Sequence, residues 1–103
     1  MKFLESMEFK IKISSTASKN IEEAVEYYNH HSKASAKNFK KKVKEGFEVL
    51  KVNPFFIVRY GEVRVLPLKK IPYILLFDVD NKKRRVNILS VFCTHQNPEK
   101  YPK

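Results

Sequence analysis

The chain of 103 residues has few cysteines, few glycines and no long apolar run. Its one cysteine, Cys93, excludes an internal disulfide framework and is typical of a protein kept in a reducing compartment. Two glycines leave no room for a glycine-rich phosphate-binding loop. No stretch approaches the roughly 20 apolar residues of a membrane span, and the first residues lack the apolar core of a signal peptide. We therefore expect a cytoplasmic protein without membrane attachment.

Acidic residues are also in short supply, with 11 Asp and Glu against 21 Lys and Arg, which gives a formal charge of +10. Such a charge predicts attraction to polyanions such as RNA, DNA, the ribosome or an acidic protein. The alternative is an ordinary solubilising surface. A chain of this length forms one domain whose core needs no metal or other cofactor.

The front half predicts one strand and two helices. Residues 8–14 alternate polar and apolar side chains, as a half-buried strand does, and residues 1–7 before them are expected to form a flexible extension in which Met7 is an alternative start. Apolar residues at helical spacing predict a first helix over residues 17–30. A second helix begins at a Ser32 or Ser35 cap and ends before Pro54.

Lysines crowd the second predicted helix between its apolar positions, at Lys37, Lys40, Lys41, Lys42 and Lys44. A helix face of this kind is either solvated or turned towards phosphates or a protein partner. Gly46 lies inside the same helix, where it costs up to about 1 kcal/mol relative to alanine, so close packing on a neighbour is the expected reason for it.

The second half predicts three antiparallel strands over residues 63–66, 73–79 and 86–92, with Pro67 closing the first and an Asp80-Asn81 turn joining the last two. The element order is β-α-α-β-β-β. Residues 8–103 are therefore expected to form a single α+β domain, an antiparallel sheet with a helical hairpin packed on one face.

Three residues invite a chemical role and also have a structural explanation. His30 and His31 are adjacent on a helix, so they point about 100° apart, and we expect exposed side chains at a helix end rather than metal ligands. Cys93 has no catalytic partner at a defined spacing, so a buried or half-buried strand thiol is expected, although a neighbouring cation could activate it.

Basic residues of the meander could line the open face of the sheet. Basic side chains around this face would contact phosphate oxygens, and Tyr73 and Tyr101 could stack on unpaired bases. For Tyr73, which follows a proline in a core strand, we expect a packing role instead. The predicted nucleic-acid-binding residues are Arg59, Lys69, Arg84, Arg85 and Tyr101.

The segments Val63–Tyr73, Tyr73–Asp80 and Ile88–Pro98 together resemble the RelE/ParE superfamily of toxins from type II toxin–antitoxin systems. The helical front half is similar to the same family, so the resemblance covers residues 8–101. The Pro72-Tyr73 pair and the Asn97-Pro98 ending are closer to the ParE branch. Cys93 stands where a histidine is frequent in the family, with His95 two residues later.

The resemblance implies a bacterial growth inhibitor that a cognate antitoxin neutralises. RelE-like toxins cleave mRNA on the ribosome, and ParE-like toxins poison DNA gyrase without a recognised catalytic site. Metal-free RNA cleavage needs an acid, a base and cations at the phosphate, and the candidates are Arg64, Lys70 and His95. The other possibility is a non-enzymatic basic binding module.

An antitoxin of this kind is expected to lie as an amphipathic segment against the helices and the sheet. Its carboxylates would meet the ammonium groups of Lys40, Lys41 and Lys44.

Overall fold

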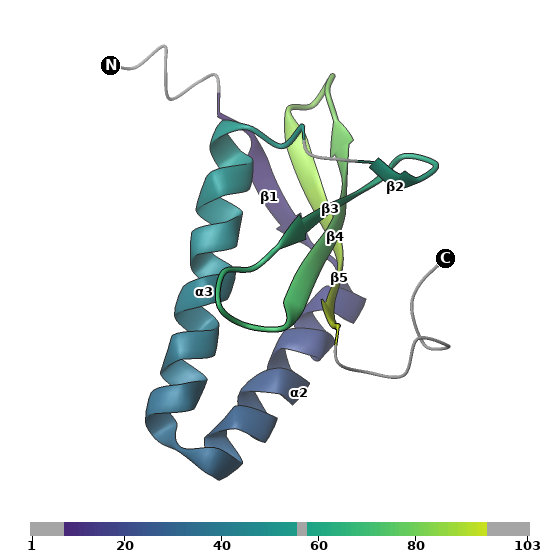
Figure 1. Cartoon of the computed structure of the whole chain (residues 1–103). Helices are drawn as coiled ribbons and strands as arrows, with labels where there is room; N and C mark the ends of the chain where they lie inside the picture. The colour runs from purple at the N-terminus through teal and green to yellow at the C-terminus, as the bar shows by residue number, and fades with distance from the viewer. Residues whose placement is uncertain (1–7, 56–57, 95–103) are drawn as a thin grey trace.

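The computed structural model describes residues 8–55 and 58–94, and for Arg59 it describes the backbone alone. The expected extension over residues 1–7 lies outside this range. The elements, labelled as in Figure 1, are β1 (Lys10–Ile13), α2 (Ser15–His31), α3 (Lys33–Val52), β2 (Val58–Tyr60), β3 (Val63–Pro67), β4 (Tyr73–Asp80) and β5 (Arg85–Cys93).

Serine side chains begin both helices. Ser14 Oγ accepts a hydrogen bond from the Ala17 backbone N–H at 3.0 Å and so caps α2. Ser32 Oγ accepts one from the Ser35 N–H at 3.0 Å and caps α3, while Asn53 ends that helix before Pro54. The two predicted helices are confirmed, and α2 starts two residues earlier than expected.

The sheet has five strands in the order β1-β5-β4-β3-β2. The predicted meander is confirmed, because β3, β4 and β5 pair antiparallel. The strand β1 pairs parallel with β5, so the sheet is mixed, and the expectation of an entirely antiparallel sheet is corrected at this edge. Alternation in a four-residue strand specifies its buried face but neither its neighbour nor its direction.

The short strand β2 was not predicted. It pairs antiparallel with the start of β3, and Gly61 turns the chain between them with a φ of +53°. Only glycine adopts this left-handed conformation without a steric cost. The strand therefore extends the sheet at the edge opposite to β1.

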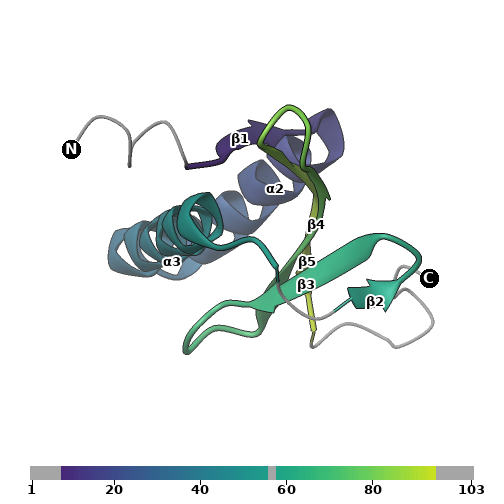
Figure 2. The same ribbon diagram turned by 90° about the horizontal axis from the view of Figure 1, so that it is seen from above.

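Both helices cover the same face of the sheet, and the view in Figure 2 shows them on one side of β4 and β5. The core lies between these layers and includes fully buried Phe39, Leu50, Phe77 and Ile88. Gly46 packs closely on the sheet as expected, since an added Cβ would lie 3.0 Å from Leu75 Cδ1. The α+β class with a helical hairpin on one face is confirmed.

The free edge of β5 is closed by polar side chains. The parallel pairing of β5 with β1 stops at Ile88. The antiparallel pairing of β5 with β4 is irregular at the next residue, Leu89. Ser14 Oγ donates to the Leu89 carbonyl at 3.1 Å, and Asn20 Oδ1 accepts from the Val91 N–H at 3.1 Å and from the Ser90 hydroxyl at 3.0 Å. The helix α2 thereby satisfies the backbone that a neighbouring strand would otherwise pair.

Within residues 8–55 and 58–94, no helix is long and apolar enough to cross a bilayer.

Candidate functional site

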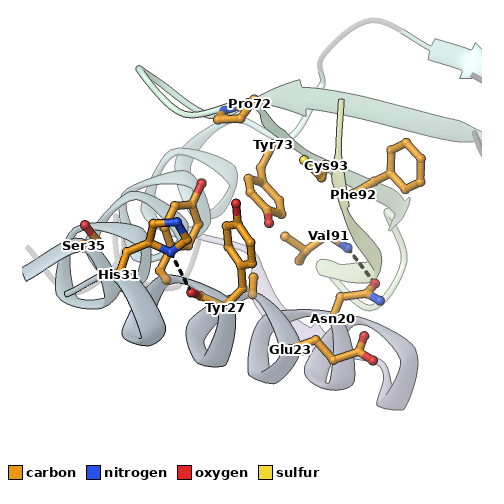
Figure 3. Close-up of a pocket in the computed structure, with 12 residues that line it drawn as sticks. Asn20, Glu23, Tyr27, His31, Ser35, Pro72, Tyr73, Val91, Phe92 and Cys93 are labelled. Atoms are coloured by element: carbon orange, nitrogen blue, oxygen red, sulfur yellow. Dashed lines mark hydrogen bonds between the residues drawn. The ribbon is translucent and has the colours of Figure 1, made fainter. Parts of the chain in front are cut away.

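A groove of about 690 Å³ runs between α2 and the ends of β4 and β5 (Figure 3). We call it the tyrosine groove. In Figure 3 the hydroxyl groups of Tyr27 and Tyr73 point into the same space, with Cys93 beside Tyr73. The other side chains that line it include Asn20, Glu23, Tyr28, His31, Pro72 and Phe92.

Tyr73 anchors the floor of this groove. Its ring lies 5.0 Å from that of Phe39 and 6.2 Å from that of Tyr28, so the expected packing role is confirmed. Burial raises the pKa of the Tyr73 hydroxyl well above 10, and the neighbouring Cys93 thiol raises that pKa further. The phenol therefore stays protonated and cannot serve as a base near neutral pH.

A second groove, of about 640 Å³, separates the free edge of β1 from α3. We call it the β1–α3 groove. Apolar side chains of Ile11, Ile13 and Phe47 line it, and Ile13 is 42 % exposed. Lys44 and Lys51 lie on its α3 side. A strand edge beside exposed apolar side chains is suited to a peptide partner.

The lysines expected to meet an antitoxin share the exposed side of α3. Lys40 and Lys44 are one helical turn apart, and Lys41 lies next to them. Only Lys44 of the three lines the β1–α3 groove. Lys44 therefore lies at the groove, whereas Lys40 and Lys41 lie on the neighbouring exposed side of α3.

At the other end of the sheet, two phenylalanine rings in contact with each other are flanked by two arginines. The guanidinium carbon of Arg84 lies 4.2 Å from the Phe9 ring centroid, and the Phe9 and Phe55 centroids are 5.8 Å apart, edge to face. The guanidinium carbon of Arg64 lies 5.5 Å from the Phe55 centroid. Contacts of this type stabilise by about 0.5–1 kcal/mol each where they are exposed.

The predicted catalytic residues are spread along β3. Arg64 pairs with Phe77 near the start of the strand, whereas Lys70 lies in the turn that follows it. Three residue steps from Arg64 to Pro67 already span about 10 Å. His95 lies outside the described residues. The structure does not place Arg64 and Lys70 side by side.

The predicted nucleic-acid-binding residues occupy three places. Lys69 is exposed in the β3–β4 turn, and Arg84 and Arg85 lie at the β4–β5 turn, where Asp80 Oδ1 accepts from the Lys83 N–H at 3.1 Å as expected for a turn. Arg59 lies in β2, with its side chain outside the described part of the chain. Tyr101 is also outside it. The described residues of this set lie at opposite ends of the sheet.

Sequence reasoning missed Asn20 and Phe55. An asparagine near the start of an amphipathic helix is indistinguishable from a solvated residue, because its partners lie about 70 residues later. Phe55 follows Pro54 in an apolar run, and its 49 % exposure had no signal in the sequence. The proximity of Lys51 to an acidic neighbour, Glu48, at 3.2 Å was likewise not predicted.

The histidines lie in the last turn of α2 and are exposed, as expected. The Nδ1 atom of His31 lies 3.2 Å from the Tyr27 carbonyl oxygen, and its ring lies 4.9 Å from the Tyr27 ring. Among the described residues, no three His, Cys, Asp or Glu side chains gather closely enough to hold a metal ion.

This fold, a helical hairpin on one face of a small mixed sheet, is shared with solved structures of RelE and ParE toxins. The chain matches the chromosomal ParDE system of P. aeruginosa with a TM-score of 0.73 at 17 % identity, covering 86 % of this chain and 99 % of that chain. It matches the archaeal RelE–RelB complex of Pyrococcus horikoshii OT3 with a TM-score of 0.56 at 12 % identity, over 86 % and 98 % of the two chains. It matches the isolated E. coli RelE toxin with a TM-score of 0.51 at 16 % identity, over 88 % and 89 %.

The family itself follows from the sequence. Residues 11–98 match the family model described as the ParE toxin of the type II toxin–antitoxin system parDE. The chain belongs to the ParE toxin family. No curated protein matches it.

Proposed function

We propose that this chain is the toxin of a type II toxin–antitoxin pair and arrests growth by poisoning DNA gyrase. One observation carries the choice of target. The Arg64 guanidinium lies over the Phe55 ring, 5.5 Å from its centroid, and away from the turn that holds Lys70. The family match at residues 11–98 supports the same choice, because resemblance to the ParE branch is what implies action on gyrase.

Metal-free RNA cleavage requires cations that flank a single phosphate, within hydrogen-bond reach of the acid and the base. Arg64 and Lys70 are separated by more than about 10 Å of strand. The Tyr73 phenol, which lies near the turn, has a raised pKa and is held protonated. This arrangement favours a toxin that acts by binding over a ribonuclease.

The test is a supercoiling and DNA-cleavage assay with purified bacterial gyrase. We expect the chain to inhibit supercoiling and to increase linear DNA, and we expect Lys70→Ala and His95→Ala to leave both effects intact. A chain that leaves gyrase unaffected would overturn the proposal.

Ribosome-dependent mRNA cleavage is the second candidate, because the basic turn of Lys69 and Lys70 lies next to Pro72 and Tyr73 of the tyrosine groove. Its test is primer extension on mRNA in a reconstituted translation system, with and without ribosomes. Cuts that appear only with ribosomes, and that Arg64→Ala or His95→Ala abolishes, would establish it. Inactivity in both assays would leave a non-enzymatic basic binding module.

For the antitoxin we propose the β1–α3 groove as the docking site. Its apolar floor of Ile11, Ile13 and Phe47 offers anchor positions. The outer edge of β1, which pairs with no other strand of the described part of the chain, offers backbone hydrogen bonds. Carboxylates of the antitoxin would meet Lys40, Lys41 and Lys44.

Charge reversal tests this placement with the protein encoded beside the toxin. The variant Lys40→Glu/Lys41→Glu/Lys44→Glu should bind the antitoxin at least about tenfold more weakly, which corresponds to a loss of about 1.4 kcal/mol or more in binding free energy. Reversal of Lys69, Lys82 and Lys83 removes the same charge elsewhere and should have a much smaller effect. Equal losses for both variants would contradict the placement.

A further inference from the structure

The lysines of α3 extend beyond the β1–α3 groove. Five of the six lysines between Lys33 and Lys44, namely Lys33, Lys37, Lys40, Lys41 and Lys44, fall within about 100° of arc around the helix at 100° per residue. All five are exposed, and we call them the lysine stripe. From the first to the last, the stripe spans about 16 Å at 1.5 Å per residue.

The stripe carries net charge that the protein does not neutralise. Among the residues that the structure describes, the ion pairs of α3 join Lys42 to Glu45 at 3.6 Å and Lys51 to Glu48 at 3.2 Å, and both of these lysines lie outside the stripe. The other acidic residues of the helical hairpin, Glu22, Glu23 and Glu26, lie on α2. The five lysines of the stripe therefore concentrate net positive charge on one side of α3.

A peptide in the β1–α3 groove does not account for this stripe. Only Lys44 of the five lines the groove, and Lys33 lies about 16 Å along the helix from it. The stripe contains no apolar side chain that could anchor a peptide, whereas phosphate contacts need only point charges. One strand of duplex DNA places a phosphate about every 3.4 Å along the axis, so 16 Å matches roughly five phosphates.

We propose that the lysine stripe binds the phosphate backbone of duplex DNA without sequence preference. The inference builds on the proposed action at gyrase, which works on duplex DNA, but the binding can be measured without gyrase. Because Lys44 also lines the β1–α3 groove, and Lys40 lies one helical turn before it, an antitoxin held there would cover this end of the stripe. DNA and antitoxin should then compete for the toxin.

The test measures binding of the full chain to a labelled 20-base-pair duplex by fluorescence anisotropy over a series of salt concentrations. The stripe variant carries Lys→Gln at all five positions. The control carries Lys→Gln at five exposed lysines elsewhere, Lys10, Lys12, Lys19, Lys82 and Lys83, so both variants lower the formal charge from +10 by five. Circular dichroism melts establish that both remain folded.

We expect the stripe variant to bind the duplex at least about tenfold more weakly than the wild type, and the control variant to lose much less affinity. The slope of log K against log salt concentration should become shallower by about 0.9 for each phosphate that is no longer neutralised. Equal losses in the two variants would overturn the proposal, as would a wild-type chain that binds no duplex or a stripe variant that loses antitoxin binding alone. If DNA binds through the stripe while gyrase is unaffected, the proposed function fails and the DNA site stands. If the stripe variant poisons gyrase as well as the wild type, the DNA site has no part in that action.

Discussion

A Cβ atom added to Gly46 would lie 2.7 Å from Cδ2 of Leu68, so α3 touches the beginning of the β3–β4 turn at this residue. Leu68 is 6 % exposed and Leu75, at 3.0 Å from the same Cβ, is fully buried, so neither has free space to move into. At this position the backbone of the helix therefore packs directly on the leucine side chains of the sheet.

The first prediction follows from this contact. Gly46→Ala gains about 1 kcal/mol of helix propensity, but overpacking costs about 1–3 kcal/mol, so we expect a net loss near 1 kcal/mol in the free energy of unfolding. Urea denaturation measures it, with Asn38→Ala at an exposed site of α3 as the control that should not destabilise. An unchanged or higher stability for Gly46→Ala would mean that Leu68 yields without cost.

The second prediction concerns Asn20. Asn20→Ala removes the acceptor of the Val91 N–H and the Ser90 hydroxyl, and an unpaired, partly buried N–H costs about 1–3 kcal/mol. Asn20→Asp retains an oxygen acceptor and should recover most of this loss. Thermal unfolding of Asn20→Ala and Asn20→Asp tests the role of Asn20 as an acceptor, with Lys19→Ala at an exposed site as the control. Equal stability of the alanine and aspartate variants would contradict that role.

The third prediction is a pH dependence. Burial and Cys93 raise the pKa of Tyr73 in the folded protein above its ordinary value of 10.0, whereas the unfolded chain keeps the ordinary value. Above pH 10 the unfolded state therefore loses a proton that the folded state retains, and stability falls as the pH rises. Below pH 10 this contribution is constant.

Tyr73→Phe removes that ionisation. Urea midpoints measured from pH 8 to pH 11 should fall more steeply for the wild type than for Tyr73→Phe, with the difference growing only above about pH 10. Parallel curves for the two proteins would show that Tyr73 ionises freely in the fold.

The fourth prediction uses the backbone at Lys70, which has a φ of +64° in the exposed β3–β4 turn. A residue with a side chain pays roughly 1–2 kcal/mol to adopt this left-handed conformation. Glycine avoids that cost but makes the unfolded chain more flexible, which offsets part of the gain. We expect Lys70→Gly to stabilise by about 0.5 kcal/mol. Lys70→Ala keeps the strain and loses the same charge, so a thermal melt in which it matches the glycine variant would contradict this explanation.

Helix ends and the meander could be predicted from the sequence because their signals are local. Ser14, Ser32 and Pro54 mark the helix boundaries, and the Asp80 turn joins β4 to β5. The α+β class follows from the order of these elements. The parallel pairing of β1 had no local signal, since nothing in four alternating residues states which strand lies beside them.

The positive charge beside the proposed antitoxin site could be predicted from the sequence, but the shape of the groove could not. Lys40, Lys41 and Lys44 were recognised from the composition of one helix, and they do share one side of α3. The β1–α3 groove needed the position of β1, and the contact of Arg64 with Phe55 needed the path of the chain after α3. Both depend on tertiary packing that periodicity does not encode.

The parallel pair of β1 and β5 joins the two ends of the described chain, and Ser14 bonds a residue 75 positions later. Helices α2 and α3 form from local contacts. The strand β5, which lies between β1 and β4 in the sheet, is the last of the described strands to be synthesised. Pairing over such a separation forms slowly, and domains fold as units while the chain is made. The sheet is therefore completed only after β5 has left the ribosome, so a nascent chain that stops before β5 carries no completed fold.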